Sequence, residues 1–216
     1  MERFFELNGT NTYVDLDCIL TAKSVDPPEP KTNLVELDGM NGSLDLSEAL
    51  TGEITYKDRT VSASFWRDSG SFRERSAFLN DIVAMFHGRK IQIVEPDDLD
   101  HYFYGRVSIG ATKNILPYCE FSISAVCDPW RYARAETTRR VDISSETDVV
   151  INNGGVKTLC PLITVNGNIT LIYDHMTSEL SSGQYQLPKL KLKRGTNIIR
   201  ASGDGSVLFT YREATL

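Results

Sequence analysis

The sequence predicts a mainly β protein with one helix, divided into an N-terminal domain of residues 1–132 and a C-terminal domain of residues 133–216. Short runs of alternating apolar and polar residues, bounded by Gly, Pro, Asn or Asp, recur along the chain and indicate strands. Only the stretch from Ser71 to Gly88 has apolar residues at helical spacing. After the segment CDPWRYARAE the strands become shorter and more closely spaced, which places the domain boundary there.

The composition is that of an ordinary globular protein, because the 216 residues are 41% hydrophobic and 24% charged. No run approaches the roughly 20 apolar residues that a membrane span needs. The N-terminal stretch MERFFELNGT lacks the basic flank and the apolar core of a signal peptide. We therefore expect a protein that is made in a cytoplasm and has no membrane partner.

The net charge of −6 is unevenly distributed along the chain. Up to residue 132 there are 13 Lys and Arg against 21 Asp and Glu, a net −8, whereas the remainder has 10 against 8, a net +2. An acidic half cannot hold a nucleic-acid backbone, because that requires Lys and Arg to displace counterions. It can line a space through which a polyanion passes. The alternative, which composition alone favours, is a well-solvated acidic surface.

The chain before residue 50 contains two short alternating runs, residues 12–20 and 33–38. Between them, the prolines of Pro27–Pro30 fix φ and withhold hydrogen-bond donors, so we expect an extended arm outside any central strand. Gly39 and Gly42 then bracket a turn that tolerates positive φ.

Two strand candidates follow, Glu53–Tyr56 and Arg59–Trp66, separated by Lys57 and Asp58 at the spacing of a hairpin. Side chains on the second alternate, so one face should be buried and the other largely polar. The buried set is Val61, Ala63 and Phe65, and the opposite set is Thr60, Ser62, Ser64 and Trp66.

The helix is predicted from its two ends and its apolar stripe. Ser71 and Glu74 have the spacing of a capping box, and Gly88 stands where a left-handed C-terminal cap is needed. The stripe indicates packing across a sheet, and it consists of Phe78, Leu79, Ile82, Val83, Met85 and Phe86.

Further strands complete both domains. Residues 90–94, 101–109 and 118–127 are expected to finish the N-terminal domain. The C-terminal domain has turn sequences such as NNGG, NGN and SGDG every few residues and no helical pattern, which is typical of an antiparallel sandwich. Its predicted strands are residues 149–152, 161–165, 169–173, 184–187, 197–201 and 206–211.

The sequence argues against an enzyme. It contains no nucleophile elbow, P-loop, dinucleotide-binding or zinc-protease motif, and GDGS at 203–206 fits a hairpin turn. No cofactor and no metal are therefore expected. The cysteines lack metal-binding spacing and fit buried structural thiols, namely Cys18, Cys119, Cys127 and Cys160.

Two groups of carboxylates are candidate sites. Those in GSLDLSEALTGEITYKDR lie on turns and hairpin ends, where exposure keeps them ordinarily ionised. Asp98, Asp100 and His101 form the other group, which is able to bind a cation, although the run misses the spacing of an EF-hand loop. A hydrolase that uses Asp98 or Asp100 is a further alternative.

The N-terminal half resembles the distal tail proteins (Dit) of bacteriophages with long non-contractile tails and of their prophages. The motifs, in order, are Pro30-Lys31, Gly39 with Gly42, Leu44-Asp45-Leu46-Ser47, and Gly52 with Tyr56 and Arg59. The similarity continues through the helix, DDLDHYFYGRV and CDPWRY into NNGGVKTLCPLITVNGNITL and YQLPKLKLKRGTNIIRASGDGSVLFTYR. It spans nearly all 216 residues.

The resemblance implies a structural virion protein. Members of the family form a hexameric ring at the tail tip, in which a tail-tube-like N-terminal domain continues the tube and a galectin-like C-terminal sandwich lies outside. The ring is a hub that joins the tail tube protein to a tail-associated lysin, a fibre or the baseplate, and DNA passes its lumen without specific binding. Such a protein is made in the cytoplasm of a bacterial host.

The proline arm suits a contact with a neighbouring subunit, because a fixed φ lowers the entropy lost on docking. A ring of identical subunits also needs a head-to-tail interface, which exposed sheet edges can supply. The candidate inter-subunit or structural residues are Pro28, Pro30, Lys31, Gly39, Gly42, Gly52, Tyr56 and Arg59.

A carbohydrate-binding module for host attachment is the alternative function, because of the galectin-like pattern. Such a site needs an aromatic platform beside convergent polar groups. The C-terminal domain has no Trp, and it offers only Tyr173, Tyr185 and His175 for this purpose.

Overall fold

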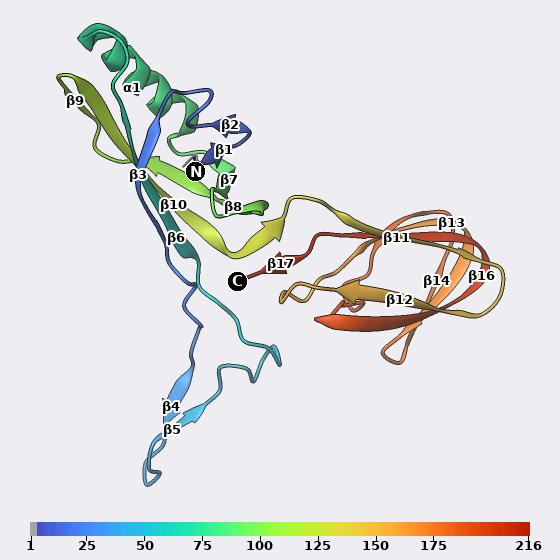
Figure 1. Cartoon of the computed structure of the whole chain (residues 1–216). Coiled ribbons are helices and arrows are strands. Elements are labelled where there is room, and N and C mark those ends of the chain that lie inside the picture. The colour runs from blue at the N-terminus through green and yellow to red at the C-terminus, as the bar shows by residue number, and fades with distance from the viewer. Residues whose placement is uncertain (1–3) are drawn as a thin grey trace. The chain divides into compact units, whose positions relative to one another are not determined.

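The computed structural model describes residues 4–216, and the chain forms two compact units. The first unit extends to Arg131 and includes Leu216, and the second is Tyr132–Thr215. As predicted, the described part of the chain is mainly β and has a single helix, α1 (Phe72–Phe86) (Figure 1). No helix in residues 4–216 is long and apolar enough to cross a membrane.

The first unit is built on one large sheet with the order β2-β1-β7-β8-β10-β6-β3, and β9 also pairs with β10. The longest register runs from Cys119 opposite Arg67 to Cys127 opposite Arg59, between β10 and β6. The strand bounds are β1 Glu6–Leu7, β2 Thr10–Asn11, β3 Ile19–Val25, β6 Arg59–Arg67, β7 Lys90–Glu95, β8 Asp98–Ile109, β9 Lys113–Ile115 and β10 Tyr118–Ala133.

The core of this unit lies between the sheet and α1. Val61, Ala63 and Phe65 of β6 are buried, as their alternation predicts, and Phe65 stacks on Phe121 of β10 with the ring centroids 5.1 Å apart. From the helix, Leu79, Ile82 and Phe86 join the same cluster. One face of the sheet therefore holds the helix and the other is left polar.

Both predicted helix ends are confirmed. The Ser71 hydroxyl accepts the Glu74 N–H at 3.3 Å, and the Glu74 carboxylate accepts the Ser71 N–H at 2.6 Å, so the capping box is complete. At the other end Gly88 has φ +77° directly after the C-cap residue His87. Arg89 adds a hydrogen bond to the Ala84 carbonyl, which suits the negative end of the helix dipole.

The predicted hairpin of Glu53–Tyr56 with Arg59–Trp66 is wrong. Only β6 is a strand there, and Tyr56 forms an isolated antiparallel bridge with Pro30 instead. Glu53–Tyr56 is thus paired with the proline segment and not with β6. The short hairpin in this region is formed by β4 (Leu34–Glu36) and β5 (Ser43–Asp45).

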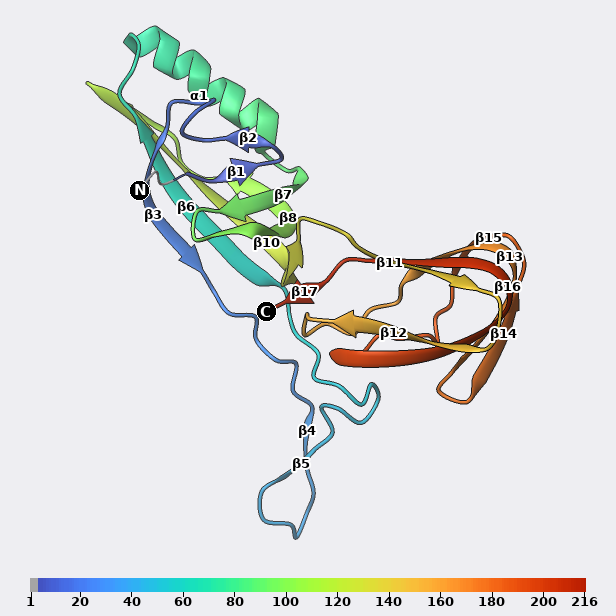
Figure 2. The same ribbon diagram turned by 45° about the vertical axis from the view of Figure 1, so that its right-hand side comes forward.

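The second unit is a two-layered antiparallel structure whose two longest strands serve both layers (Figure 2). In one layer β11 pairs with the second half of β16, and β15 with the first half of β13. In the other, β12 pairs with the first half of β16, and β14 with the second half of β13. The bounds are β11 Thr137–Ile143, β12 Thr147–Asn153, β13 Leu162–Tyr173, β14 Met176–Leu180, β15 Gly183–Gln186, β16 Gly195–Tyr211 and β17 Ala214–Thr215.

The sequence was wrong to divide β13 and β16 into shorter strands at NGN and SGDG. The two strands pair without interruption from Leu162 opposite Thr210 to Ile172 opposite Arg200. Gly167, Gly203 and Gly205 have positive φ, and a Cβ on any of them would lie 2.0–2.2 Å from a carbonyl oxygen of the partner strand. These glycines permit close backbone contact where the paired strands bend, and they are not hairpin turns.

We predict that Gly205→Ala lowers the free energy of unfolding by about 3 kcal/mol or more, because backbone strain adds to the displacement of the Asn166 carbonyl. Gly195→Ala is the matched control, since φ is also positive there but nothing lies within 4 Å of the added Cβ. Thermal or urea unfolding of both variants measures the difference. Equal losses would show that β13 and β16 do not approach so closely.

Candidate assembly arm

The segment between β3 and β6, residues 27–58, is the candidate functional site and is called the arm below. It carries the β4–β5 hairpin away from the sheet (Figures 1 and 2). Gly39 and Gly42, in the hairpin turn, have φ +85° and +81°, and Gly52 has φ +69°. Nothing lies within 4 Å of a Cβ at these positions. Glycine is therefore favoured there by backbone conformation and not by space.

The two legs of the arm are bonded to each other near its base. The Lys31 N–H donates to the Thr55 carbonyl and the Lys57 N–H to the Glu29 carbonyl, both at 2.8 Å. The Lys57 ammonium also lies 2.9 Å from the Glu29 carboxylate. Pro30, which has no N–H, sits between these bonds as the partner of Tyr56. The proline segment is thus one of two extended backbone segments that pair with each other at the base of the arm.

Beyond this base the arm has no core. No residue from Glu29 to Asp58 is buried. The side chain of Leu50 is 97% exposed, and five further large apolar residues of the arm are exposed with it. Exposed apolar side chains gathered on one segment mark an interaction surface. The six are Leu34, Leu37, Met40, Leu44, Leu50 and Ile54.

The arm also carries most of the net negative charge of residues 1–132. It has seven Asp and Glu against Lys31 and Lys57, a net −5 of the −8 in that half of the chain. By contrast, the polar face of β6 and β10 is rich in uncharged hydroxyls, since Ser62 faces Ser124 and Ser64 faces Ser122. The charge asymmetry seen in the sequence therefore belongs mainly to the arm.

Arg59 fixes the point where the arm rejoins the sheet. Only 6% of this residue is exposed. Its Nε donates to the Asp26 carbonyl at 2.9 Å and its NH1 to the Pro129 carbonyl at 3.3 Å, and the guanidinium lies 5.1 Å from the centre of the Phe103 ring. Burial, with the nearby charge of Arg131, lowers the pKa of Arg59. One side chain thus joins the beginning of the arm, β8 and β10.

Two further contacts support the arm base. Pro28 is buried, in contrast to the residues that follow it. The Tyr56 ring meets the Trp130 ring edge to face, with the centroids 5.6 Å apart. Of the eight residues singled out in the sequence, Pro28, Pro30, Tyr56 and Arg59 therefore meet at or near the base. Lys31 bonds there through its backbone, and the three glycines lie farther along.

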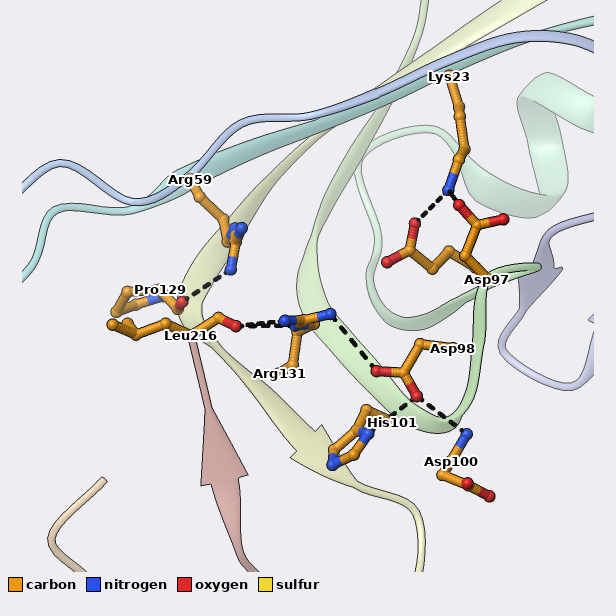
Figure 3. A network of polar contacts seen from close by, with 10 residues as sticks. Lys23, Arg59, Asp97, Asp98, Asp100, His101, Pro129, Arg131 and Leu216 are labelled. Atoms are coloured by element: carbon orange, nitrogen blue, oxygen red, sulfur yellow. Dashed lines mark hydrogen bonds and ion pairs between the residues drawn. The ribbon is translucent and has the colours of Figure 1, made fainter. Parts of the chain in front are cut away.

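A polar network lies next to this base (Figure 3). One Asp98 oxygen is 2.9 Å from Nδ1 of His101, and the other is 3.4 Å from NH1 of Arg131. The Arg131 guanidinium donates twice to the Leu216 carbonyl, at 3.0 and 2.5 Å. Nearby, the Lys23 ammonium pairs with Glu95 at 2.6 Å and Asp97 at 2.5 Å.

The network engages the carboxylate of Asp98, which the sequence indicates as a candidate cation ligand or as a candidate catalytic residue of a hydrolase. Burial alone would raise the pKa of Asp98, but the hydrogen bond with His101 and the charges of His101 and Arg131 outweigh it, so the pKa is lowered. Asp98 is therefore a poor general acid. Within residues 4–216 no cluster of three or more His, Cys, Asp and Glu side chains is arranged to hold a metal ion.

The thiols are similarly unsuited to nucleophilic chemistry. Cys18, Cys119 and Cys127 are buried, as expected for small hydrophobes, and Cys160 is half-buried. Burial raises the pKa of Cys18 and of Cys127 to about 12. Both side chains are thus protonated at neutral pH.

Comparison with known proteins identifies the fold. No protein-family model and no curated protein matches the sequence. Among solved structures, the chain is similar to the Dit protein (gp 19.1) of phage SPP1, described as a paradigm of the hub adsorption apparatus in phages that infect Gram-positive bacteria. The identity is 13%, with 97% of this chain and 98% of that chain covered at a TM-score of 0.71. The predicted resemblance to distal tail proteins is confirmed at the level of the fold.

A second solved structure is similar over the same share of the chain. It is a chain of the phage p2 baseplate in its activated conformation with Sr, with 9% identity over 97% of this chain and 98% of that chain. Its TM-score of 0.42 is too low to support an argument from it.

We predict that Arg59→Ala lowers the free energy of unfolding of the first unit by about 2–4 kcal/mol, because two partly buried hydrogen bonds lose their charged donor. Arg59→Lys should recover only part of this, since an ammonium cannot copy the guanidinium fork. Urea unfolding and hydrogen exchange of residues 27–58 measure both effects. Arg73→Ala, at an exposed helix position, should change stability by less than about 0.5 kcal/mol. Similar losses in Arg59→Ala and Arg73→Ala would refute the role given to Arg59.

We also predict that Asp98→Asn destabilises the protein by about 1 kcal/mol at neutral pH and not in acid. The pKa of Asp98 is lowered from 3.8, so its contribution is complete above that pH and is lost as the pH falls through the lower native value. Stability measured from about pH 7 down to about pH 2 should show a constant difference between the two proteins that shrinks only below about pH 4. Asp100→Asn, which changes an exposed side chain, should run parallel to the unchanged protein. A constant difference at all pH values would contradict the prediction.

Proposed function

We propose that this protein is a structural component of a phage or prophage tail tip, where it acts as the hub between the tail tube and the adsorption apparatus. The observation that carries the proposal is the similarity of the whole chain, both units included, to a phage hub protein. A match to one unit alone would suggest only a common domain. A tail-tip location, with synthesis in the bacterial host cytoplasm, follows from this assignment.

The proposed assembly is a homohexameric ring made by a head-to-tail interface. In such an interface each subunit offers one surface and receives another, so the ring closes without leaving an unmatched face. The arm supports this assignment, because its exposed apolar side chains have no partner within the described chain that buries them. The eight residues of the arm and its base would then act by shaping and holding an inter-subunit contact.

A lumen for DNA fits the polar face of β6 and β10. Thr60, Ser62 and Ser64 on β6 stand opposite Val126, Ser124 and Ser122 on β10. These positions offer no Lys or Arg to hold a phosphate backbone, so a polyanion can pass without sticking. We therefore assign this hydroxyl-rich face, and not the acidic arm, to the wall of the lumen.

The second unit is the proposed attachment point for a tail-associated lysin, a fibre or other baseplate proteins. The carbohydrate-binding alternative gains no support from its tyrosines. The Tyr173 hydroxyl donates to the Lys191 carbonyl at 2.5 Å, and the Tyr185 hydroxyl to the Ser181 carbonyl at 3.0 Å. Both polar tips are thus engaged inside the unit.

Purified full-length protein should form rings of six subunits, with a mass about six times 24.2 kDa. Native mass spectrometry over a range of concentrations and negative-stain electron microscopy measure this directly. Antibody labelling of the tails should place the protein at the tip. A protein that stays monomeric at every concentration and is absent from purified tails would contradict the proposed function.

A further inference from the structure

Arg75 is a buried cation without a counter-ion. Only 2% of the residue is exposed, and it lies in the first turn of α1. Its Nε donates to the Asn114 side-chain oxygen at 3.2 Å and its NH1 to the Gly70 carbonyl at 2.5 Å, and both acceptors are neutral. Its NH2 is buried and has no hydrogen-bond partner within residues 4–216. Because the buried NH2 group belongs to a cation and has no acceptor, this arrangement is unfavourable until an anion pairs with it.

Two more unpaired polar atoms lie in the same short segment. The buried Nε of Arg67 and the buried hydroxyl of Ser69 have no hydrogen bond in the described chain. Arg67 lies 3.7 Å from the Asp17 carboxylate, which is close enough for attraction but too long for a hydrogen bond. With the Arg75 NH2 group, these are the three buried side-chain atoms in residues 4–216 that lack a partner. In the described residues, the buried side-chain atoms without a hydrogen-bond partner therefore all lie between the end of β6 and the first turn of α1.

The charges of the Arg67 and Arg75 guanidinium groups both influence the same buried side chain, Cys119. Burial raises the pKa of the Cys119 thiol, while the charges of Arg67 and Arg75 both oppose that rise. Both cations are thus near Cys119 of β10. The positive charges of Arg67 and Arg75 thus lie close together, but Asp17 is 3.7 Å from Arg67, whereas Arg75 has no ion pair within the described residues.

Exposed apolar side chains cover the same corner. Phe72 is 55% exposed at the start of α1, and Leu116 is 74% exposed after β9. Asn114 joins these two elements, because its amide donates to the Phe72 carbonyl at 2.8 Å and to the Ser76 hydroxyl at 2.7 Å. The α1–β9 surface (Figure 1) is defined here as Phe72, Arg75, Asn114, Ile115 and Leu116.

The partner that fits this surface presents carboxylates among large apolar side chains. The arm of the same chain has this chemistry. Leu37 is exposed between Glu36 and Asp38, and Leu34 and Met40 are exposed two residues to either side of this pair. Glu36 and Asp38 are themselves exposed and form no ion pair within residues 4–216. In a head-to-tail ring, each subunit would supply one such arm and one such surface.

We propose that the arm of one subunit binds the α1–β9 surface of the next, with Glu36 or Asp38 as the counter-ion of Arg75. This proposal rests on the ring of the proposed function, and it adds which two surfaces meet. The NH2 group of Arg75 is buried, so the carboxylate reaches it when the side chains that cover it move aside. The apolar residues of the arm then cover Phe72, Ile115 and Leu116.

A cross-linking experiment on the full chain tests the contact. Leu37→Cys and Leu116→Cys, prepared as separate proteins and mixed, should form a disulfide between copies under mild oxidation, because both positions are exposed. Leu37→Cys mixed with Val150→Cys is the matched control, since Val150 is exposed on the second unit. Three of the four native cysteines are buried, and each variant alone measures their background.

A charge reversal tests the energetics. Glu36→Lys should weaken ring formation about tenfold or more, because it places a cation beside Arg75. Glu179→Lys, an exposed position on the second unit, makes the same change in net charge and should leave assembly unaltered. Sedimentation or native mass spectrometry at several salt concentrations measures both.

The outcomes separate this contact from the ring itself. Rings that form without a cross-link between positions 37 and 116, and that tolerate Glu36→Lys, would overturn the proposal and leave the hub function standing. A cross-link equally strong with the Val150→Cys control would also overturn it. A protein that never assembles would remove both the contact and the proposed function on which it rests.

Discussion

The hydrogen bonds of the buried Arg59 guanidinium are the interaction on which the first unit depends, because they hold together the two ends of a long exposed insertion in a packed sheet. The chain leaves the sheet after β3 and returns at β6, and the two ends of that excursion must be held together. Hydrogen bonds from Arg59 to the Asp26 and Pro129 carbonyls, with the Phe103 ring beneath, do this at the core. The arm beyond can then remain exposed without loosening the strands.

Sequence patterns predicted the parts of the fold that depend on interactions between residues close together in the chain. The capping box of Ser71 and Glu74 and the alternation along β6 are both present in the structure. The pairing of Glu53–Tyr56 was not accessible in this way, because it depends on Pro30, which lies far along the chain. Likewise, Gly203 and Gly205 have the composition of a turn, but their positive φ serves close contact with β13.

The candidate site was predicted unevenly for a similar reason. Arg59 and Tyr56 were found through a family resemblance and not through chemistry, and the structure places both at the base of the arm. Arg75 gave no signal, because an Arg in the first half of an amphipathic helix normally reaches solvent. Only the structure shows that it is buried and that its acceptors, the Asn114 side chain and the Gly70 carbonyl, are neutral.

The two features that the isolated chain leaves unsatisfied are complementary. The arm exposes apolar side chains with negative charge, and the α1–β9 surface exposes apolar side chains above a positive charge. In a single copy each feature costs free energy, and in the ring proposed above each would be met once per subunit. Assembly of that proposed ring would remove water from both apolar surfaces and supply the missing anion in the same step. The free energy of such a ring would then depend on contacts that the monomer cannot form, which favours complete rings over partial ones.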